Sequence, residues 1–77
     1  MKKEEYKNKA GQTRYRPVLT QRQYLNAEEK YIGFCINCGR TRNKCEPDAR
    51  LYHCPGCKQE KVYGIPELLV MGIAKIV

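Results

Sequence analysis

Apolar positions are sparse at the start of the chain and become periodic only further along. Residues 1–17 contain six Lys or Arg, two Glu, and Tyr6 and Tyr15 as their only aromatic side chains. A glycine and a proline interrupt this segment, and both residue types break regular structure. The pattern predicts a basic, flexible arm over residues 1–17 and a folded part over residues 18–77.

Two short helices are predicted to flank the folded part. Thr20 and Gln23 have the spacing of a capping box, in which each side chain accepts a hydrogen bond from the backbone of the other. A helix is therefore predicted over about residues 20–30. In the tail, Pro66 suits a first helical turn and Gly72 suits the position just past a helix end. These two residues bracket a predicted helix of two turns.

Short apolar runs separated by turn residues predict four strands between these helices. The predicted strands cover residues 31–34, 40–45, 50–53 and 60–63. A turn over residues 46–49 separates the second strand from the third. Pairs of cysteines occupy the other two connections, so the order is strand, cysteine turn, strand, turn, strand, cysteine turn, strand. This order predicts a small β-rich fold with antiparallel pairing.

The two cysteine pairs carry the strongest chemical signal in the sequence. Cys35 and Cys38 are separated by two residues, as are Cys54 and Cys57, and fifteen residues lie between the pairs. This interval is typical of a four-cysteine zinc site. A two-residue spacing lets one tight turn direct both sulfurs at the same ion. The sequence therefore predicts Zn²⁺ as the cofactor, with these four cysteines as its ligands.

A disulfide framework is the less favoured alternative for these cysteines. The chain begins with charged residues rather than with an apolar secretory signal, so we expect a cytoplasmic, reducing location. Paired cysteines in such a compartment are usually metal ligands or redox centres. A thioredoxin-like redox pair needs a βαβ context, for which this chain is too short.

Cys45 and His53 lie close to the two pairs without belonging to them. The favoured interpretation of Cys45 is a buried thiol that packs as a small apolar group. His53 is expected on the surface or beside the ligands, because neighbours along a strand point to opposite faces. A ligand role for either residue stays open. Four thiolates close the coordination shell, whereas a catalytic zinc keeps one position for water, so no enzymatic activity is expected.

Length and composition make the metal important for folding. The chain has 77 residues, of which only fifteen are Leu, Ile, Val or Phe. A chain this small normally needs a metal, disulfides or a partner to fold, because its core is small. We therefore expect one metal-stabilised domain. No apolar run approaches the ~18 residues of a membrane span, so no membrane is expected as a partner. No small-molecule substrate is expected either, because four thiolates leave the metal without an open position.

Residues 31–64 resemble the zinc-ribbon superfamily, which occurs in transcription factors, polymerase subunits and ribosomal proteins. A longer set of motifs resembles small uncharacterised zinc-ribbon proteins of phages and prophages. These motifs are Cys38-Gly39-Arg40, Glu46-Pro47-Asp48-Ala49-Arg50, Tyr52, the second cysteine pair, Val62-Tyr63-Gly64 and Glu67-Leu68-Leu69. The resemblance implies a zinc-ribbon fold and leaves the function open. Lys58 departs from the family pattern, which has a glycine at that position.

The net charge of +7 favours a polyanionic partner, because Lys and Arg side chains that meet phosphates release condensed counterions. DNA or RNA is therefore the predicted partner. The residues predicted to bind it are Arg14, Tyr15, Arg16, Arg40, Arg42, Lys44 and Arg50. Tyr15 is predicted to stack on a base while its two neighbours hold phosphates. A solvated basic surface without a nucleic-acid role is the alternative.

The apolar tail over residues 65–77 supports a second functional hypothesis. Several of its side chains share a helical face, namely Ile65, Leu68, Leu69, Ile73 and Ile76. One interpretation is that this face covers the open side of the ribbon. The other is that Leu69, Met71, Ile73 and Ile76 dock on a protein partner, for example in transcription or virion assembly. The sequence therefore predicts a non-enzymatic nucleic-acid-binding module, with a protein-binding adaptor as the alternative.

Overall fold

The structure is a computed structural model that describes residues 1–77. Its elements, in chain order, are β1 (Lys2–Lys7), β2 (Thr13–Leu19), α1 (Gln21–Glu29), β3 (Gly33–Cys35), β4 (Thr41–Arg42), β5 (Tyr52–His53), β6 (Glu60–Gly64), α2 (Ile65–Val70) and β7 (Lys75–Ile76). The prediction of a small β-rich fold with one helix on each side of the cysteine-bearing strands is confirmed. Neither helix combines the length and the apolar character that crossing a membrane requires.

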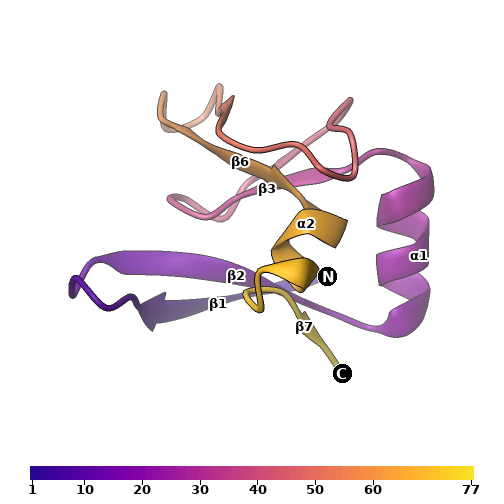
Figure 1. Ribbon diagram of the computed structural model, residues 1–77, viewed down its shortest axis with the longest axis horizontal. Coiled ribbons are helices and arrows are strands. Elements are labelled where there is room, and N and C mark those ends of the chain that lie inside the picture. Colours follow the sequence, from indigo (N-terminus) through magenta and orange to yellow (C-terminus); the bar gives the residue numbers. More distant parts are fainter.

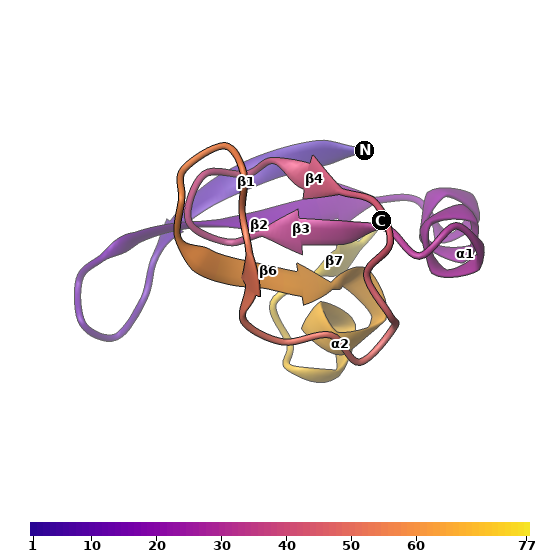
Figure 2. The ribbon, with the colours of Figure 1, turned by 90° about the horizontal axis from the view of Figure 1, so that it is seen from above.

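The strands form two sheets. The first has the order β1-β2-β7, with β1 antiparallel and β7 parallel to β2. The second has the order β4-β3-β6-β5 and is antiparallel throughout. Figure 1 shows the two sheets as separate layers, with α2 in front of the space between them and α1 at one end. The cysteine turns lie at the other end of the second sheet, away from α1 (Figure 2).

The basic arm predicted for residues 1–17 is instead a β-hairpin. Strands β1 and β2 pair over six positions, from Lys2 opposite Val18 to Lys7 opposite Thr13. The side chain of Asn8 closes the connecting loop by accepting hydrogen bonds from the backbone N–H groups of Ala10 and Gln12. Gly11 has a φ of 78° in this loop, a conformation that glycine adopts without steric cost. The expectation of a flexible arm was therefore wrong.

The hairpin is held because β2 contributes to the main apolar core. That core contains Leu19, Ala27, Phe34, Ile36, Ile65, Leu68 and Ala74. It draws one or more side chains from each layer of the molecule, so it joins the hairpin to both helices and to the second sheet. A second, smaller cluster surrounds the cysteine turns and contains Cys35, Cys45, Ala49, Cys54 and Val62.

Both predicted helices are present with the expected end signals. Thr20 caps α1: its hydroxyl accepts from the Gln23 N–H at 3.2 Å, and the Gln23 side chain accepts from the Thr20 N–H at 2.8 Å. Helix α2 begins with Pro66 in its first turn, and Gly72 follows its end with a φ of 77°. The chain then adds β7 to the first sheet, an element that the sequence pattern did not predict.

Candidate metal centre

The two cysteine turns have the same backbone geometry. In the first turn, Cys35 N–H donates to the Arg40 carbonyl and Gly39 N–H donates to the Cys35 carbonyl, both at 2.8 Å. In the second, Cys54 N–H donates to the Gln59 carbonyl and Lys58 N–H to the Cys54 carbonyl, again at 2.8 Å. The repeated pattern follows from the repeated spacing, and it presents two sulfurs from each turn.

Lys58 completes this correspondence despite its departure from the glycine expected there. Its φ is 66°, close to the 81° of Gly39 at the equivalent position of the first turn. A left-handed conformation costs a residue with a Cβ roughly 1–2 kcal/mol. The second turn therefore forms in spite of this residue, with the same backbone hydrogen bonds as the first turn.

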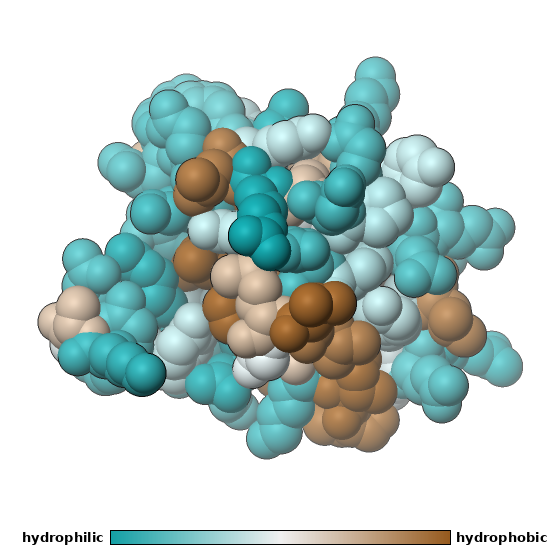
Figure 3. Space-filling model, viewed as in Figure 1, coloured by the Kyte–Doolittle hydropathy of each residue, from teal (hydrophilic) through white to brown (hydrophobic).

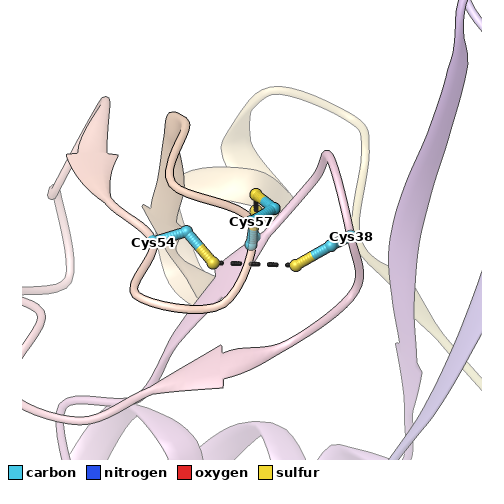
Figure 4. A group of neighbouring side chains, drawn as sticks. Cys38, Cys54 and Cys57 are labelled. Carbon is cyan, nitrogen blue, oxygen red and sulfur yellow. Dashed lines mark hydrogen bonds between the residues drawn. The ribbon is translucent and has the colours of Figure 1, made fainter.

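The four sulfurs converge on one point between the turns. The sulfur atoms of Cys35, Cys38, Cys54 and Cys57 all lie within 4.8 Å of one another. Across the turns, Cys35 lies 3.6 Å from Cys57, and Cys38 lies 3.6 Å from Cys54. Figure 4 shows the side chains of Cys38 and Cys54 pointing toward each other from opposite turns. These four residues are those that the sequence predicted as metal ligands.

The spacing of the sulfurs matches a metal better than a disulfide. A tetrahedron with zinc–sulfur bonds of about 2.3 Å has sulfur–sulfur edges of about 3.8 Å. A disulfide would bring two sulfurs to about 2.05 Å, and all five cysteines of the chain are free thiols. The donor set, four cysteine sulfurs in two turns, is the one that structural Zn²⁺ sites use. The residues therefore fit Zn²⁺.

Burial and hydrogen bonding act in opposite directions on the four thiols. Burial raises the pKa of Cys35 to about 12 and also raises the pKa of Cys38. For Cys54, burial also acts to raise the pKa, but backbone N–H donors of the second turn outweigh it and lower the pKa. A hydrogen bond from the Asn37 side chain lowers the pKa of Cys57 to about 6.

The effects of burial and hydrogen bonding on these pKa values are those expected of a site that binds a cation through thiolates. Backbone N–H groups of the turns point at the sulfurs: those of Asn37 and Cys38 at Cys35, and that of Arg40 at Cys38. Such donors stabilise thiolates, while burial without a cation favours the protonated thiol. Metal binding needs all four sulfurs deprotonated. A divalent ion would supply the positive charge that lets the two buried thiols ionise.

Cys45 and His53 lie outside the four-sulfur cluster. Cys45 is buried, and its sulfur packs so closely on Gly33 that a Cβ added to that glycine would lie 2.5 Å away. This placement matches the interpretation of Cys45 as a small apolar core residue. His53 is exposed on β5, and its carbonyl accepts a hydrogen bond from the Arg42 guanidinium at 2.9 Å.

Some of the residues predicted to bind nucleic acid contact other side chains of this protein, and the others are exposed to solvent. Tyr15 is half-buried against the core under the Lys3 ammonium, 5.2 Å from its ring centre. Arg16 lies 3.5 Å from a Glu4 oxygen and over the ring of Tyr6. The ring face of Tyr15 is therefore not free to stack on a base in this conformation.

Three more of the predicted arginines also have partners within the chain. The Arg14 guanidinium donates a hydrogen bond to the Asn37 side chain at 3.1 Å, and the Arg42 guanidinium donates to the His53 carbonyl of β5. Arg50 pairs with Glu67 of α2. Arg40 and Lys44 are exposed. Sequence reasoning could not distinguish these two from the others, because the intramolecular partners are distant along the chain.

The apolar residues predicted to dock on a partner lie in a partly open surface. Leu69, Met71 and Ile76 are 37–41% exposed, whereas Ile73 is half-buried and packs against the main core. Val70 and Val77, which the sequence analysis did not select, are 81% and 69% exposed. Figure 3 shows apolar side chains gathered over the region of α2 and β7. We call Leu69, Val70, Met71, Ile76 and Val77 the tail surface.

Comparisons with known proteins add no assignment, because no family model, no curated protein and no solved structure matches this chain.

Proposed function

We propose that this chain is a non-enzymatic zinc-ribbon module that binds the phosphate backbone of DNA or RNA at the end where its two cysteine turns meet. The proposal rests on Zn²⁺ at the four-sulfur centre, which would fix the two turns relative to each other. The metal has a structural role in this proposal, since four cysteines leave no coordination position for substrate or water.

The observation that carries the proposal is an open groove between the turns, with Arg40 in its wall. The groove has a volume of about 530 Å³ and is lined by Gly39, Arg40, Thr41, Cys54, Pro55 and Gly56. The Arg40 side chain lies across Gly56, and the stem of Lys3 lies across Gly39. Lys58 is exposed on the second turn. We call Lys3, Arg40 and Lys58 the turn-end cations. Arg40 lines the groove; Lys3, whose ammonium also lies over the Tyr15 ring, and Lys58 are exposed next to the two turns.

The charge of the loaded module remains suited to a polyanion. Four thiolates and one divalent cation reduce the formal charge of +7 by two, to +5. Positive charge on so small a surface favours association with phosphates through counterion release. Pairing of Arg14, Arg16, Arg42 and Arg50 within the chain moves the proposed contact from the hairpin to the turn-end cations.

Binding of the zinc-loaded protein to a labelled DNA duplex is expected to weaken steeply as salt is raised. Arg40→Ala should weaken binding and reduce the slope of log K against log salt by about 0.9, since one phosphate contact is lost. The measurement is fluorescence anisotropy over a salt series, repeated with single-stranded DNA and RNA.

Arg22→Ala is the matched control, because Arg22 is an exposed cation on α1, at the end of the molecule away from the cysteine turns. It should leave the slope unchanged. Absence of binding, or equal slopes for the Arg40 and Arg22 variants, would show that the groove does not contact phosphates.

A protein-binding adaptor is the second candidate function, and the exposure of the tail surface favours it. Val70, at 81% exposure, buries almost none of its apolar area within the chain. Contiguous exposed apolar side chains often mark contacts with other proteins. The occupant we propose is an apolar groove on a partner protein, for example a component of transcription or assembly machinery.

Polar replacement of the tail surface is expected to abolish capture of that partner. Val70→Ser combined with Met71→Gln keeps the backbone of α2 and β7, whereas deleting residues 70–77 would also remove the core residue Ala74 and the pairing of β7 with β2. Metal content and anisotropy with DNA should stay unchanged. Leu25→Ser, at an exposed apolar position on α1, is the control, and equal capture by all three proteins would contradict the adaptor.

A further inference from the structure

Arg40 spans the two cysteine turns. Its carbonyl accepts a hydrogen bond from the Cys35 N–H at 2.8 Å, so its backbone belongs to the first turn. Its side chain crosses to the second turn and lies on Gly56. A Cβ added to that glycine would overlap Cδ of Arg40 and would lie 2.5 Å from its Nε. The two turns face each other (Figure 4), so one residue completes the first turn and covers the second.

The backbone of the second turn does not require a glycine at position 56. Gly39 has a φ of 81°, in the left-handed range, whereas Gly56 does not adopt a positive φ. The equivalent residue of the first turn is Asn37, and the two turns have the same backbone hydrogen bonds. A side chain at this position is therefore compatible with the turn. In the second turn its place is taken by the stem of Arg40, which a Cβ would displace.

The guanidinium at the end of this stem has no partner within the chain. The other four arginines predicted to bind nucleic acid each have a hydrogen bond or an ion pair with another residue. Arg40 is exposed in the wall of the groove between the turns. A long side chain that must be ordered on binding costs affinity, and a stem that already lies on the protein reduces that cost. Arg40 thus combines a placed stem with five N–H donors that are open to a ligand.

We infer that Gly56 is a positioning residue, which holds the Arg40 guanidinium in the groove for a phosphate group of the nucleic acid. The inference rests on the proposed function and identifies the contact that orients its main cation. A guanidinium presents parallel N–H donors that match two oxygens of one phosphate. Zn²⁺ at the four sulfurs would fix the distance between the turns, so the seat on Gly56 connects the metal centre to the phosphate contact.

The test is a double-mutant cycle of Gly56→Ala and Arg40→Ala, measured as anisotropy of labelled DNA with the zinc-loaded proteins over a salt series. Gly56→Ala should lower the affinity by about 2- to 10-fold, the cost of ordering one long side chain on binding. It should leave the slope of log K against log salt unchanged, because Arg40 keeps its charge and still reaches the phosphate. In the Arg40→Ala background, Gly56→Ala should change neither the affinity nor the slope.

Other effects of the added methyl group give different results. Obstruction of the groove would lower the affinity in the Arg40→Ala background as well. Damage to the turn would lower the Zn²⁺ content per chain, which is measured for every variant. Gly56→Asn, which places the residue of the first turn in the second, should retain Zn²⁺ and lose affinity as Gly56→Ala does. In the parent protein, NMR should show a nuclear Overhauser effect between the δ protons of Arg40 and the α protons of Gly56.

Full affinity in Gly56→Ala, or an equal loss in both backgrounds, would overturn the inference and leave the proposed function in place. If neither Gly56 variant takes up Zn²⁺, the nuclear Overhauser effect in the parent decides: its presence supports the seat on Gly56, and its absence overturns the inference. Failure of the parent to bind any of the nucleic acids would overturn the proposed function and, with it, the phosphate role of Arg40.

Discussion

Removal of the metal is expected to unfold the whole chain. Structural Zn²⁺ contributes about 10–16 kcal/mol of apparent binding free energy in small zinc-finger domains, whereas the core of a chain this size supplies only about 3–5 kcal/mol. The cluster around the turns includes Cys35 and Cys54 themselves, so it loses its organising element with the metal. A chelator titration followed by two-dimensional NMR should show the dispersed amide signals collapse, and added Zn²⁺ should restore them.

Single substitutions separate the ligand role of a cysteine from its role in packing. Cys54→Ser removes one ligand and is expected to give the collapsed spectrum even with Zn²⁺ present. Cys45→Ala is the matched control, because Cys45 is equally buried and lies outside the four-sulfur cluster. Loss of its sulfur should cost about 1 kcal/mol and leave the spectrum dispersed.

Two outcomes would contradict this account of the metal. A chain that stays dispersed in excess chelator would show that the apolar core alone holds the fold. Equal damage from Cys54→Ser and Cys45→Ala, measured as metal content per chain, would require a different set of ligands.

The metal centre could be predicted from the sequence because its geometry is local. Two residues between cysteines determine a tight turn, and the equal hydrogen bonds of the two turns show that this spacing was sufficient. The capping box at Thr20 and the Pro66 and Gly72 signals of α2 are local in the same sense, so both helices were also predicted correctly.

The hairpin was missed because composition was given more weight than turn chemistry. Charged residues fill β1, and such residues also protect an exposed edge strand from pairing with other chains. Asn8 and Gly11, three residues apart between two runs of mixed polar and aromatic residues, were the available hairpin signal. The parallel pairing of β7 with β2 joins residues more than fifty positions apart, and a two-residue strand gives no periodicity to detect.

Which arginines are free to bind a partner was the property that the sequence predicted least well. Four of the five arginines predicted to bind nucleic acid have a partner that is remote in the sequence, such as Asn37 for Arg14 and His53 for Arg42. A charge count cannot show such pairings, since it depends on composition and not on contacts. The result is that fewer cations remain open than the net charge suggests.

Arg50 shows the consequence most clearly, because its loss is expected to destabilise the fold rather than to weaken nucleic-acid binding alone. Its Nε donates to Oε2 of Glu67 at 2.6 Å, and its Nη2 contacts the same oxygen. The Glu67 side chain is 10% exposed and the Arg50 side chain 64% exposed. Glu67 lies in α2, whose neighbours Ile65 and Leu68 belong to the main core, so the pair fastens the connection before β5 to the core.

Arg50→Ala should lower the free energy of unfolding by about 2 kcal/mol. The loss is smaller than the ~3–5 kcal/mol typical of breaking a fully buried pair, because water screens the exposed guanidinium. Urea denaturation at a fixed free Zn²⁺ concentration measures it. Glu67→Gln should cost less, since it leaves no unpaired buried charge, and Lys44→Ala at an exposed position should stay within about 0.5 kcal/mol.

The double variant Arg50→Ala/Glu67→Gln tests whether Arg50 and Glu67 stabilise the fold as an ion pair or independently. If Arg50 acts through Glu67, then Arg50→Ala in the Glu67→Gln background should cost clearly less than in the parent protein, because the unpaired carboxylate is gone. Additive losses would show that Arg50 stabilises the fold by other contacts. If Arg50→Ala lowers the free energy of unfolding no more than Lys44→Ala does, Arg50 does not stabilise the fold, and its side chain is available to bind phosphates.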